Sequence, residues 1–307
     1  MPITCGIPVQ PLAHTPARFD FVEPDRLDAA LALLAEDEST AVVAGGTDLL
    51  RLIRIGHARP ARVVSIARLA ELRGVQRRED GGLSIGALTT MAALAGDPEI
   101  RRRAPALAEA AAQVGSPQVR NRATIGGNLV NASPCADSAP PCAVHAAEVV
   151  LRSAAGERRL ALADFMTGPG QTVRRPDELL AAVELPPAGP RTGCAFETLT
   201  RRKTLEITIA SATARLSLAP DGTLATARVC LGSVAPVWLL SAGAERDLIG
   251  KDPDAATLAA AARAAAADAS PIDDLRGGAV YRRSMVEVLS RRALQRALRR
   301  AEAGGAP

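Results

Sequence analysis

Strand-like and helix-like segments alternate through the first part of this chain, and this alternation limits its possible folds more than any other feature. Residues 19–22 alternate like a strand, and residues 27–34 carry leucine and alanine at helical spacing. The apolar run 41–44 is typical of a buried strand, and residues 105–114 are typical of an alanine-rich helix. Further strands are predicted at 62–66, 83–87, 148–152 and 179–185, and Thr89 is the predicted N-cap of another helix.

Residues 115–141 interrupt this alternation. The stretch is rich in glycine, asparagine, serine and proline and has little periodicity. Long connections of this kind usually exist for function rather than for packing. We therefore predict a long functional loop.

A second domain is predicted after residue 193. The chain has 307 residues, 48% of them hydrophobic, and a domain takes roughly 100–200 residues, so two domains are expected. Glycine and proline cluster between residues 186 and 193, which places the boundary there. Beyond it, β-rich runs joined by a Pro220-Asp221-Gly222 turn predict antiparallel strands. The expected strands cover 195–199, 208–218 and 223–231, and the expected helices cover 254–269 and 281–301.

Composition argues against several classes of protein. The formal charge is +4, but arginine is interleaved with aspartate and glutamate, which indicates a solvated surface or, alternatively, a docking surface for an acidic partner. Aromatic residues are 2% of the chain, and the single Trp238 and Tyr281 cannot form a stacking platform for nucleic acid. The five cysteines include no C-x-x-C pair, so neither a disulfide framework nor a zinc or iron–sulfur site is expected. We expect a cytoplasmic protein with no export signal and no membrane span.

Two glycine turns could carry chemistry. Gly45-Gly46-Thr47-Asp48 follows an apolar strand, and Thr124-Ile125-Gly126-Gly127-Asn128 lies in the predicted loop. Glycine leaves backbone N–H groups unshielded, so both turns are suited to anions, and together they could hold one pyrophosphate from two sides. Neither has the spacing of a Rossmann or Walker A motif. Each could also be an ordinary turn, and Asp137 could either accept from a ligand hydroxyl or cap a turn.

In order and spacing, residues 44–49, 119–128 and 132–137 resemble the FAD-binding subunits of the xanthine dehydrogenase and carbon monoxide dehydrogenase family of molybdenum hydroxylases. The resemblance covers nearly the whole chain. It implies an α+β protein: a PCMH or vanillyl-alcohol-oxidase type FAD-binding fold of two α+β subdomains, followed by a smaller C-terminal α+β domain. The implied limits are an N-terminal lead at 1–17, the FAD-binding domain at 18–188, the C-terminal domain at 189–301 and a tail at 302–307.

The resemblance also implies the residues that hold FAD. The first glycine turn and its flanks would wrap the pyrophosphate from one side and the second turn from the other, with an aspartate bonding a hydroxyl and two apolar residues in contact. The implied set is Val42, Val43, Ala44, Gly45, Gly46, Thr47, Asp48, Leu49, Val114, Thr124, Ile125, Gly126, Gly127, Asn128, Asp137 and Leu180. Val114 and Leu180 could equally be core residues.

By resemblance, this subunit passes electrons and leaves the organic substrate to a partner. A large subunit would hold the molybdopterin cofactor and a small subunit 2Fe-2S clusters, and FAD would pass electrons to NAD or another acceptor. Two features of relatives are missing. Larger members have a lysine near the flavin, where residues 196–199 read Phe-Glu-Thr-Leu, and some relatives have a cysteine-rich insertion for a four-iron cluster.

No catalytic triad or metal-ligand spacing surrounds the three histidines, so no catalytic or metal residue is assigned. Two alternatives remain open. One is a self-sufficient FAD dehydrogenase or oxidase, which would need an acid–base residue beside the flavin. The other is a scaffold subunit that has lost FAD, against which the intact glycine turns argue.

Overall fold

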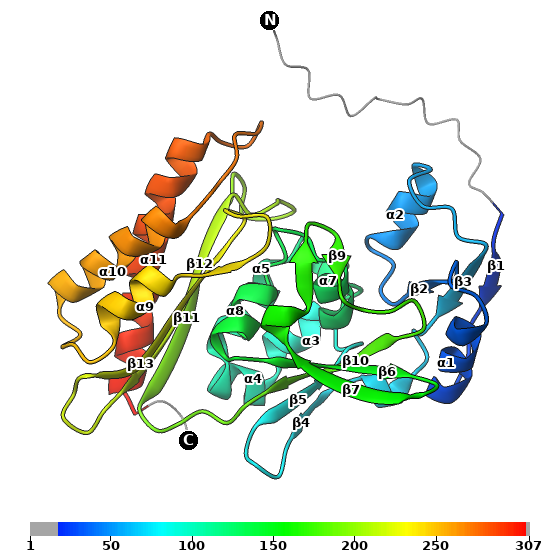
Figure 1. Ribbon diagram of the computed structural model, residues 1–307, viewed down its shortest axis with the longest axis horizontal. Coiled ribbons are helices and arrows are strands. Elements are labelled where there is room, and N and C mark those ends of the chain that lie inside the picture. The colour runs from blue at the N-terminus through cyan, green and yellow to red at the C-terminus, as the bar shows by residue number, and fades with distance from the viewer. Residues whose placement is uncertain (1–17, 305–307) are drawn as a thin grey trace, which may run out of the picture.

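The computed structural model describes residues 18–304, which form three units side by side (Figure 1). The N-terminal unit is a three-stranded parallel sheet in the order β1-β3-β2, with two helices. Leu27, Ala30, Leu31 and Leu34 are buried on one face of the first helix, as their spacing predicts. The elements are β1 (Asp20–Val22), α1 (Leu27–Glu36), β2 (Ala41–Val43), α2 (Leu49–Arg54) and β3 (Arg62–Ser65).

The middle unit is a five-stranded antiparallel sheet in the order β4-β5-β10-β6-β7. Its central strand β10 (Leu179–Leu185) is the last of the five in sequence, and it pairs with both β5 and β6. Helices pack on this sheet around a core that includes Ile85, Leu107 and Phe165. The other strands are β4 (Val75–Arg77), β5 (Leu83–Gly86), β6 (Glu148–Ser153) and β7 (Gly156–Ala161), with a small hairpin of β8 (Met166–Gly168) and β9 (Gln171–Thr172).

Residues 115–141 are not a structureless loop, so that prediction is wrong. They contain α6 (Pro117–Arg120), α7 (Ile125–Val130) and the start of α8 (Ala139–Val144). The side chains of Ser116 and Thr124 cap the first two helices by accepting from Val119 N and Gly127 N. Helices this short have no hydrophobic period to detect, and capping chemistry is what defines them.

The predicted cap at Thr89 is displaced by one residue. Thr90 caps α3 (Met91–Gly96) by accepting from Ala93 N, whereas the Thr89 hydroxyl bonds the backbone of Gly74 in both directions. Two further helices follow, α4 (Pro98–Arg103) and α5 (Pro105–Gln113).

The C-terminal unit is a four-stranded antiparallel sheet, β11-β12-β13-β14, with α10 and α11 packed against one face (Figure 1). Ala210, Ala212, Ala214 and Leu216 are alternate residues of the second strand, and they pack into the core with these helices. The opposite face contacts α5 and α8 of the middle unit. The elements are β11 (Thr192–Leu199), β12 (Ala210–Leu218), β13 (Leu224–Gly232), β14 (Leu239–Leu240), α9 (Ala242–Leu248), α10 (Ala255–Asp268) and α11 (Ala279–Glu302).

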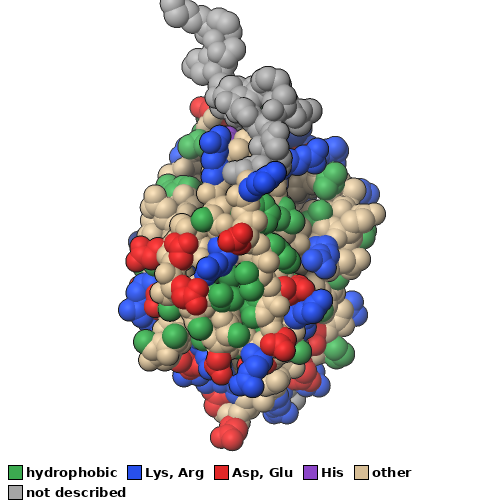
Figure 2. All heavy atoms as spheres, turned by 90° about the vertical axis from the view of Figure 1, so that its right-hand side faces the viewer, with side chains coloured by type: hydrophobic (Ala, Val, Ile, Leu, Met, Phe, Trp, Pro, Cys, Tyr) green, Lys and Arg blue, Asp and Glu red, His purple; other side chains and the backbone are tan. Residues whose placement is uncertain are grey.

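The architecture is α+β, as predicted. Within residues 18–304, no helix has the length and apolar character needed to cross a membrane. The face formed by the N-terminal unit carries basic and acidic side chains intermixed (Figure 2), in agreement with the interleaved charges of the sequence.

Candidate functional site

The first glycine turn joins β2 to α2 and leaves its backbone donors free. Gly46 has a φ of 76°, a left-handed conformation that favours glycine. Among the hydrogen bonds between described residues, none uses the N–H groups of residues 45–48. Four successive backbone donors with no acceptor among the described residues are the kind of group that binds an anion.

The second glycine turn lies directly against the first, although about eighty residues separate them in sequence. A Cβ atom placed on Gly45 would lie 1.9 Å from the carbonyl oxygen of Arg122. Only glycine permits this backbone approach at position 45. The segment that leads into Thr124 is therefore in contact with the end of β2, and the fold brings the two predicted turns together.

The backbone donors of the second turn are not free, in contrast to the prediction. Ile125 N and Gly126 N donate to the carbonyls of Thr89 and Ala87, which lie at the end of β5. Gly127 N donates to Thr124 Oγ1 at 3.1 Å, and Asn128 N to the Thr124 carbonyl. Docking on β5 and helix capping use these groups, which sequence spacing alone could not reveal.

The two glycines of this turn have different roles. A Cβ atom on Gly126 would lie 2.7 Å from the Cβ atom of Ala87, so this glycine allows α7 to pack on the sheet. Gly127 is exposed, and a Cβ atom there would meet only Thr124 Oγ1, at 3.1 Å. Gly127 therefore presents a bare surface to whatever binds beside it. Asn128 Oδ1 accepts from the Ser138 hydroxyl at 2.6 Å, which orients the amide.

Asp137 lies where the middle and C-terminal units meet. Its Oδ1 atom accepts from the Thr208 hydroxyl at 2.7 Å, and Thr208 Oγ1 lies 3.3 Å from Thr198 Oγ1. Burial raises the pKa of Asp137 to about 6, and the bond from Thr208 opposes that rise. Sequence reasoning missed Thr208, because the contact joins residues 71 positions apart.

The remaining predicted residues are largely packing positions. Leu180, in β10, is 4% exposed and lies in the core of the middle unit, and Val114 packs against the same core from the end of α5. Val43 is buried beside α2, whereas Val42 and Ala44 pack against the core of α1. Leu49 begins α2 and is partly buried.

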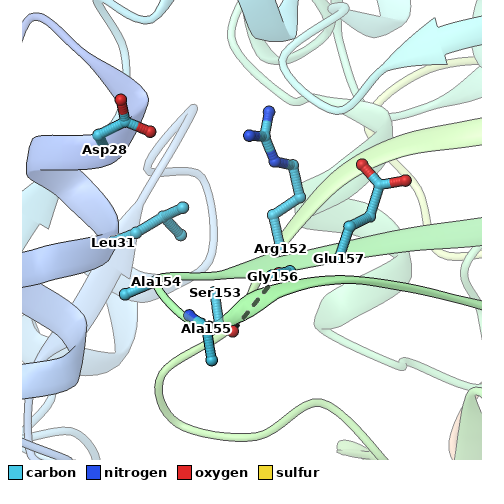
Figure 3. A pocket seen from close by; sticks show the side chains of 8 residues that line it. All are labelled: Asp28, Leu31, Arg152, Ser153, Ala154, Ala155, Gly156 and Glu157. Atoms are coloured by element: carbon cyan, nitrogen blue, oxygen red, sulfur yellow. Dashed lines mark hydrogen bonds between the residues drawn. The ribbon is translucent and has the colours of Figure 1, made fainter.

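A separate hollow of about 450 Å³ lies between α1 and the turn of the β6–β7 hairpin. Figure 3 shows Asp28 and Leu31 of α1 facing Arg152 and Glu157 of the hairpin. The hollow shares no residue with the glycine turns, and its charged side chains are of both signs. We therefore place the candidate site at the glycine turns, where the N–H groups of residues 45–48 bond to no other described residue.

The described residues contain no group of three histidine, cysteine, aspartate or glutamate side chains that could hold a metal ion. Burial lowers the pKa of His145 to about 3, aided by Arg215 and Arg228 nearby, so this imidazole is neutral at ordinary pH. Cys135, Cys142, Cys194 and Cys230 are free thiols, and Cys5 lies outside the described residues. Nothing in this arrangement provides a nucleophile with a base beside it.

Comparisons with known proteins identify the family of the chain. The model of the FAD binding domain in molybdopterin dehydrogenase matches residues 17–188, and that of the CO dehydrogenase flavoprotein C-terminal domain matches residues 195–297. The carbon monoxide dehydrogenase medium chain of Hydrogenophaga pseudoflava is 35% identical over 92% of this chain and 98% of its own length. The xanthine dehydrogenase FAD-binding subunit of Escherichia coli is 33% identical over 94% of this chain and 99% of its own length.

Solved structures give the same result. Carbon monoxide dehydrogenase from Hydrogenophaga pseudoflava superposes with a TM-score of 0.88 at 33% identity, covering 94% of this chain and 99% of the other. Quinoline 2-oxidoreductase from Pseudomonas putida 86 superposes with a TM-score of 0.87 at 30% identity, with the same coverage. Domain matches, full-length relatives and fold all agree, and the chain therefore belongs to the FAD-binding subunits of the molybdopterin-dependent dehydrogenases.

Proposed function

We propose that the pyrophosphate of FAD lies between the turn of residues 45–48 and the exposed surface of Gly127. The observation that carries this proposal is the direct backbone contact between Gly45 and Arg122, which places four N–H donors that bond to no described residue beside the second turn. An anion there would accept from these donors. Residues 42–49 and 124–128 would hold the cofactor, Asp137 would bond one of its hydroxyls, and Val114 and Leu180 would make apolar contact.

The residues of this chain would bind and orient the cofactor rather than react. Bound FAD supplies the oxidation–reduction chemistry itself. The Asn128 amide, fixed by Ser138, and the Asp137 carboxylate, fixed by Thr208, provide oriented polar groups. Preorganisation of this kind holds a ligand at a low entropic cost.

We infer that the chain works within a cytoplasmic complex of three kinds of subunit. The large subunit would hold the molybdopterin cofactor and oxidise the substrate, and a small subunit would hold 2Fe-2S clusters. This subunit would receive their electrons on FAD and pass them to NAD or another acceptor. The names of the relatives, which are subunits of xanthine and carbon monoxide dehydrogenases, support this division of labour. The FAD-binding domain would comprise residues 18–188 and the C-terminal domain residues 189–301.

The direct test is to isolate the untagged chain from its native cells, and to record its visible spectrum and the polypeptides that accompany it. Flavin and iron–sulfur absorbance with two further subunits is the expected result. A flavin-containing protein that is solitary and oxidises a small substrate would favour a self-sufficient dehydrogenase, and a colourless protein would overturn both readings.

Two neighbouring glycines provide a matched test of the pyrophosphate site. Gly127→Val fills the exposed surface, so we expect loss of FAD, while the free energy of unfolding of the cofactor-free variant differs from that of the cofactor-free wild type by less than about 1 kcal/mol. Gly126→Ala drives a methyl group against Ala87 and should cost about 1–3 kcal/mol of stability through overpacking. The flavin-to-protein absorbance ratio measures the FAD content of each variant, and urea unfolding measures its stability. Normal flavin content in Gly127→Val would contradict the proposed site.

A further inference from the structure

Exposed apolar side chains gather on two segments of the C-terminal unit. Ten large hydrophobic side chains are exposed within residues 18–304, and six of them belong to residues 205–207 and 272–281. Their exposed fractions are high, and two of them, Leu275 and Val280, reach 77% and 79%. The six are Leu205, Ile207, Ile272, Leu275, Val280 and Tyr281. We call the surface formed by these two segments the apolar edge. Soluble proteins rarely gather such side chains without a partner.

One buried arginine bonds residues beside both segments of the apolar edge. Arg282 is 3% exposed, and its guanidinium donates to the carbonyls of Ile209, Ser233 and Gly277. It also forms an ion pair with Asp274 at 2.6 Å. These bonds join the turn before α11 to Ile209, two residues beyond Ile207, and so link the two segments. A preformed surface loses little entropy when a partner binds.

The apolar edge also borders the candidate flavin site. Leu205 N donates to the Gly115 carbonyl at 3.0 Å, and Thr208, one residue after Ile207, bonds Asp137. In Figure 1 the start of α11 and the β11–β12 connection lie at the same upper edge of the C-terminal unit. A protein seated here would be close to whatever residues 124–137 hold.

The charge of the same segments indicates the character of the occupant. Residues 201–207 and 272–283 carry six basic and three acidic side chains. Arg201, Lys203 and Arg283 are exposed, and none forms an ion pair with a described residue. An acidic surface around an apolar centre would complement this pattern.

We propose that the apolar edge is the docking surface for the electron-donating iron–sulfur subunit, through an apolar patch ringed by acidic residues. The inference rests on the proposed function, because a donor must sit near the flavin to transfer electrons. It goes further by assigning the contact to residues 205–207 and 272–281 of the C-terminal unit.

The test compares two variants of the chain in the whole complex, expressed in its native cells. The double variant Leu275→Asp with Val280→Asp places charge at the centre of the apolar edge. Ile249→Asp is the matched control, since Ile249 is 50% exposed and follows α9, outside the apolar edge. We expect the double variant to fold and to retain its flavin. The amount of iron–sulfur subunit that co-purifies with it should fall at least about tenfold. The Ile249→Asp control should co-purify with as much iron–sulfur subunit as the wild type.

A second measurement covers the case in which the double variant is unstable. Leu275→Ser alone should weaken recovery of the iron–sulfur subunit without changing the unfolding midpoint, and raised salt should weaken it further. Undiminished recovery in flavin-containing variants would overturn the docking surface and leave the proposed function intact. A wild-type chain without flavin would instead overturn the proposed function.

Discussion

Thr208 and Asp137 meet across two units of the fold, and their contact makes a prediction at the scale of a single residue. Asp137 has a raised pKa, so its ionised form costs stability as the pH rises from the ordinary value of 3.8 through about 6. The Thr208 hydroxyl reduces that cost by bonding the carboxylate. The bond matters most where Asp137 is ionised.

Thr208→Val should therefore destabilise the protein more at pH 8 than at pH 5, by about 1.5–3 kcal/mol at the higher pH. Thr208→Ser retains the hydroxyl and serves as the control. Urea unfolding of both variants and the wild type at the two pH values measures the difference. An equal loss at both pH values would show that Thr208 acts only by packing.

At the scale of elements, a buried carboxylate connects the edge strand β7 to the residues just before the central strand β10. Glu178 is 1% exposed and pairs with Arg158 of β7 and with Arg175. Although burial opposes ionisation, the bonds from Arg158 and Arg175 prevail and lower the pKa of Glu178 to about 2. Arg158 of β7 and two groups of the segment before β10 thus hold the edge of the middle sheet.

Because this pKa is lowered, the stabilisation is present above the ordinary value of 4.5 and is lost as the pH falls towards about 2. It amounts to about 3 kcal/mol, on the scale of 1.36 kcal/mol per unit of pKa shift. Glu178→Gln should remove this pH-dependent stabilisation and so lower the free energy of unfolding at pH 7. Unfolding free energies of variant and wild type should converge below about pH 3. Parallel curves across the whole range would contradict the assignment.

The elements also show what the sequence could predict. Periodicity identified the strands at 41–44 and 208–218 and the long C-terminal helices, because each has a repeating apolar face. It could not identify α6 or α7, which are defined by hydroxyl caps. Nor could it place β10 between β5 and β6, because strand order depends on contacts made after the chain has collapsed.

The candidate site, too, could be predicted from the sequence only in part. The glycine turns could be recognised from residue types, and the first has the free donors that glycine favours. Local and tertiary contacts decided the rest: carbonyls just after β5 and groups of Thr124 accept from the donors of the second turn, and a hydroxyl from the other unit holds Asp137. Sequence reasoning identifies which residues are capable of an interaction, whereas the fold determines which partner each one finds.

At the scale of the whole molecule, Glu109 of α5 links the middle unit to the C-terminal unit. Its carboxylate pairs with Arg296 and Arg300 of α11 and accepts from Phe196 N of β11 at 3.0 Å. Glu109→Ala would leave two partly buried arginines and one backbone donor without this partner. Removing one member of a partly buried pair in this way should cost about 2–4 kcal/mol.

The expected result is separation of the two units. Denaturant unfolding of Glu109→Ala, followed by Trp238 fluorescence and by circular dichroism, should show two transitions where the wild type shows one. Glu302→Ala, at the end of the same helix, is the control, since Glu302 is exposed. A single unchanged transition in Glu109→Ala would show that apolar packing alone holds the units together.

The contact of Gly45 with Arg122 also bears on how a newly made chain matures. Residues 45–48 are synthesised about eighty residues before Gly127, so the proposed cofactor site is incomplete until the ribosome has passed both turns. FAD loading must then follow synthesis of both turns, and it would stabilise the folded state more as the cofactor supply rises. In riboflavin-starved cells, amide hydrogens of β2 and α2 should exchange faster than in loaded protein. Supply of a vitamin would thus set how long the newest molecules survive proteolysis.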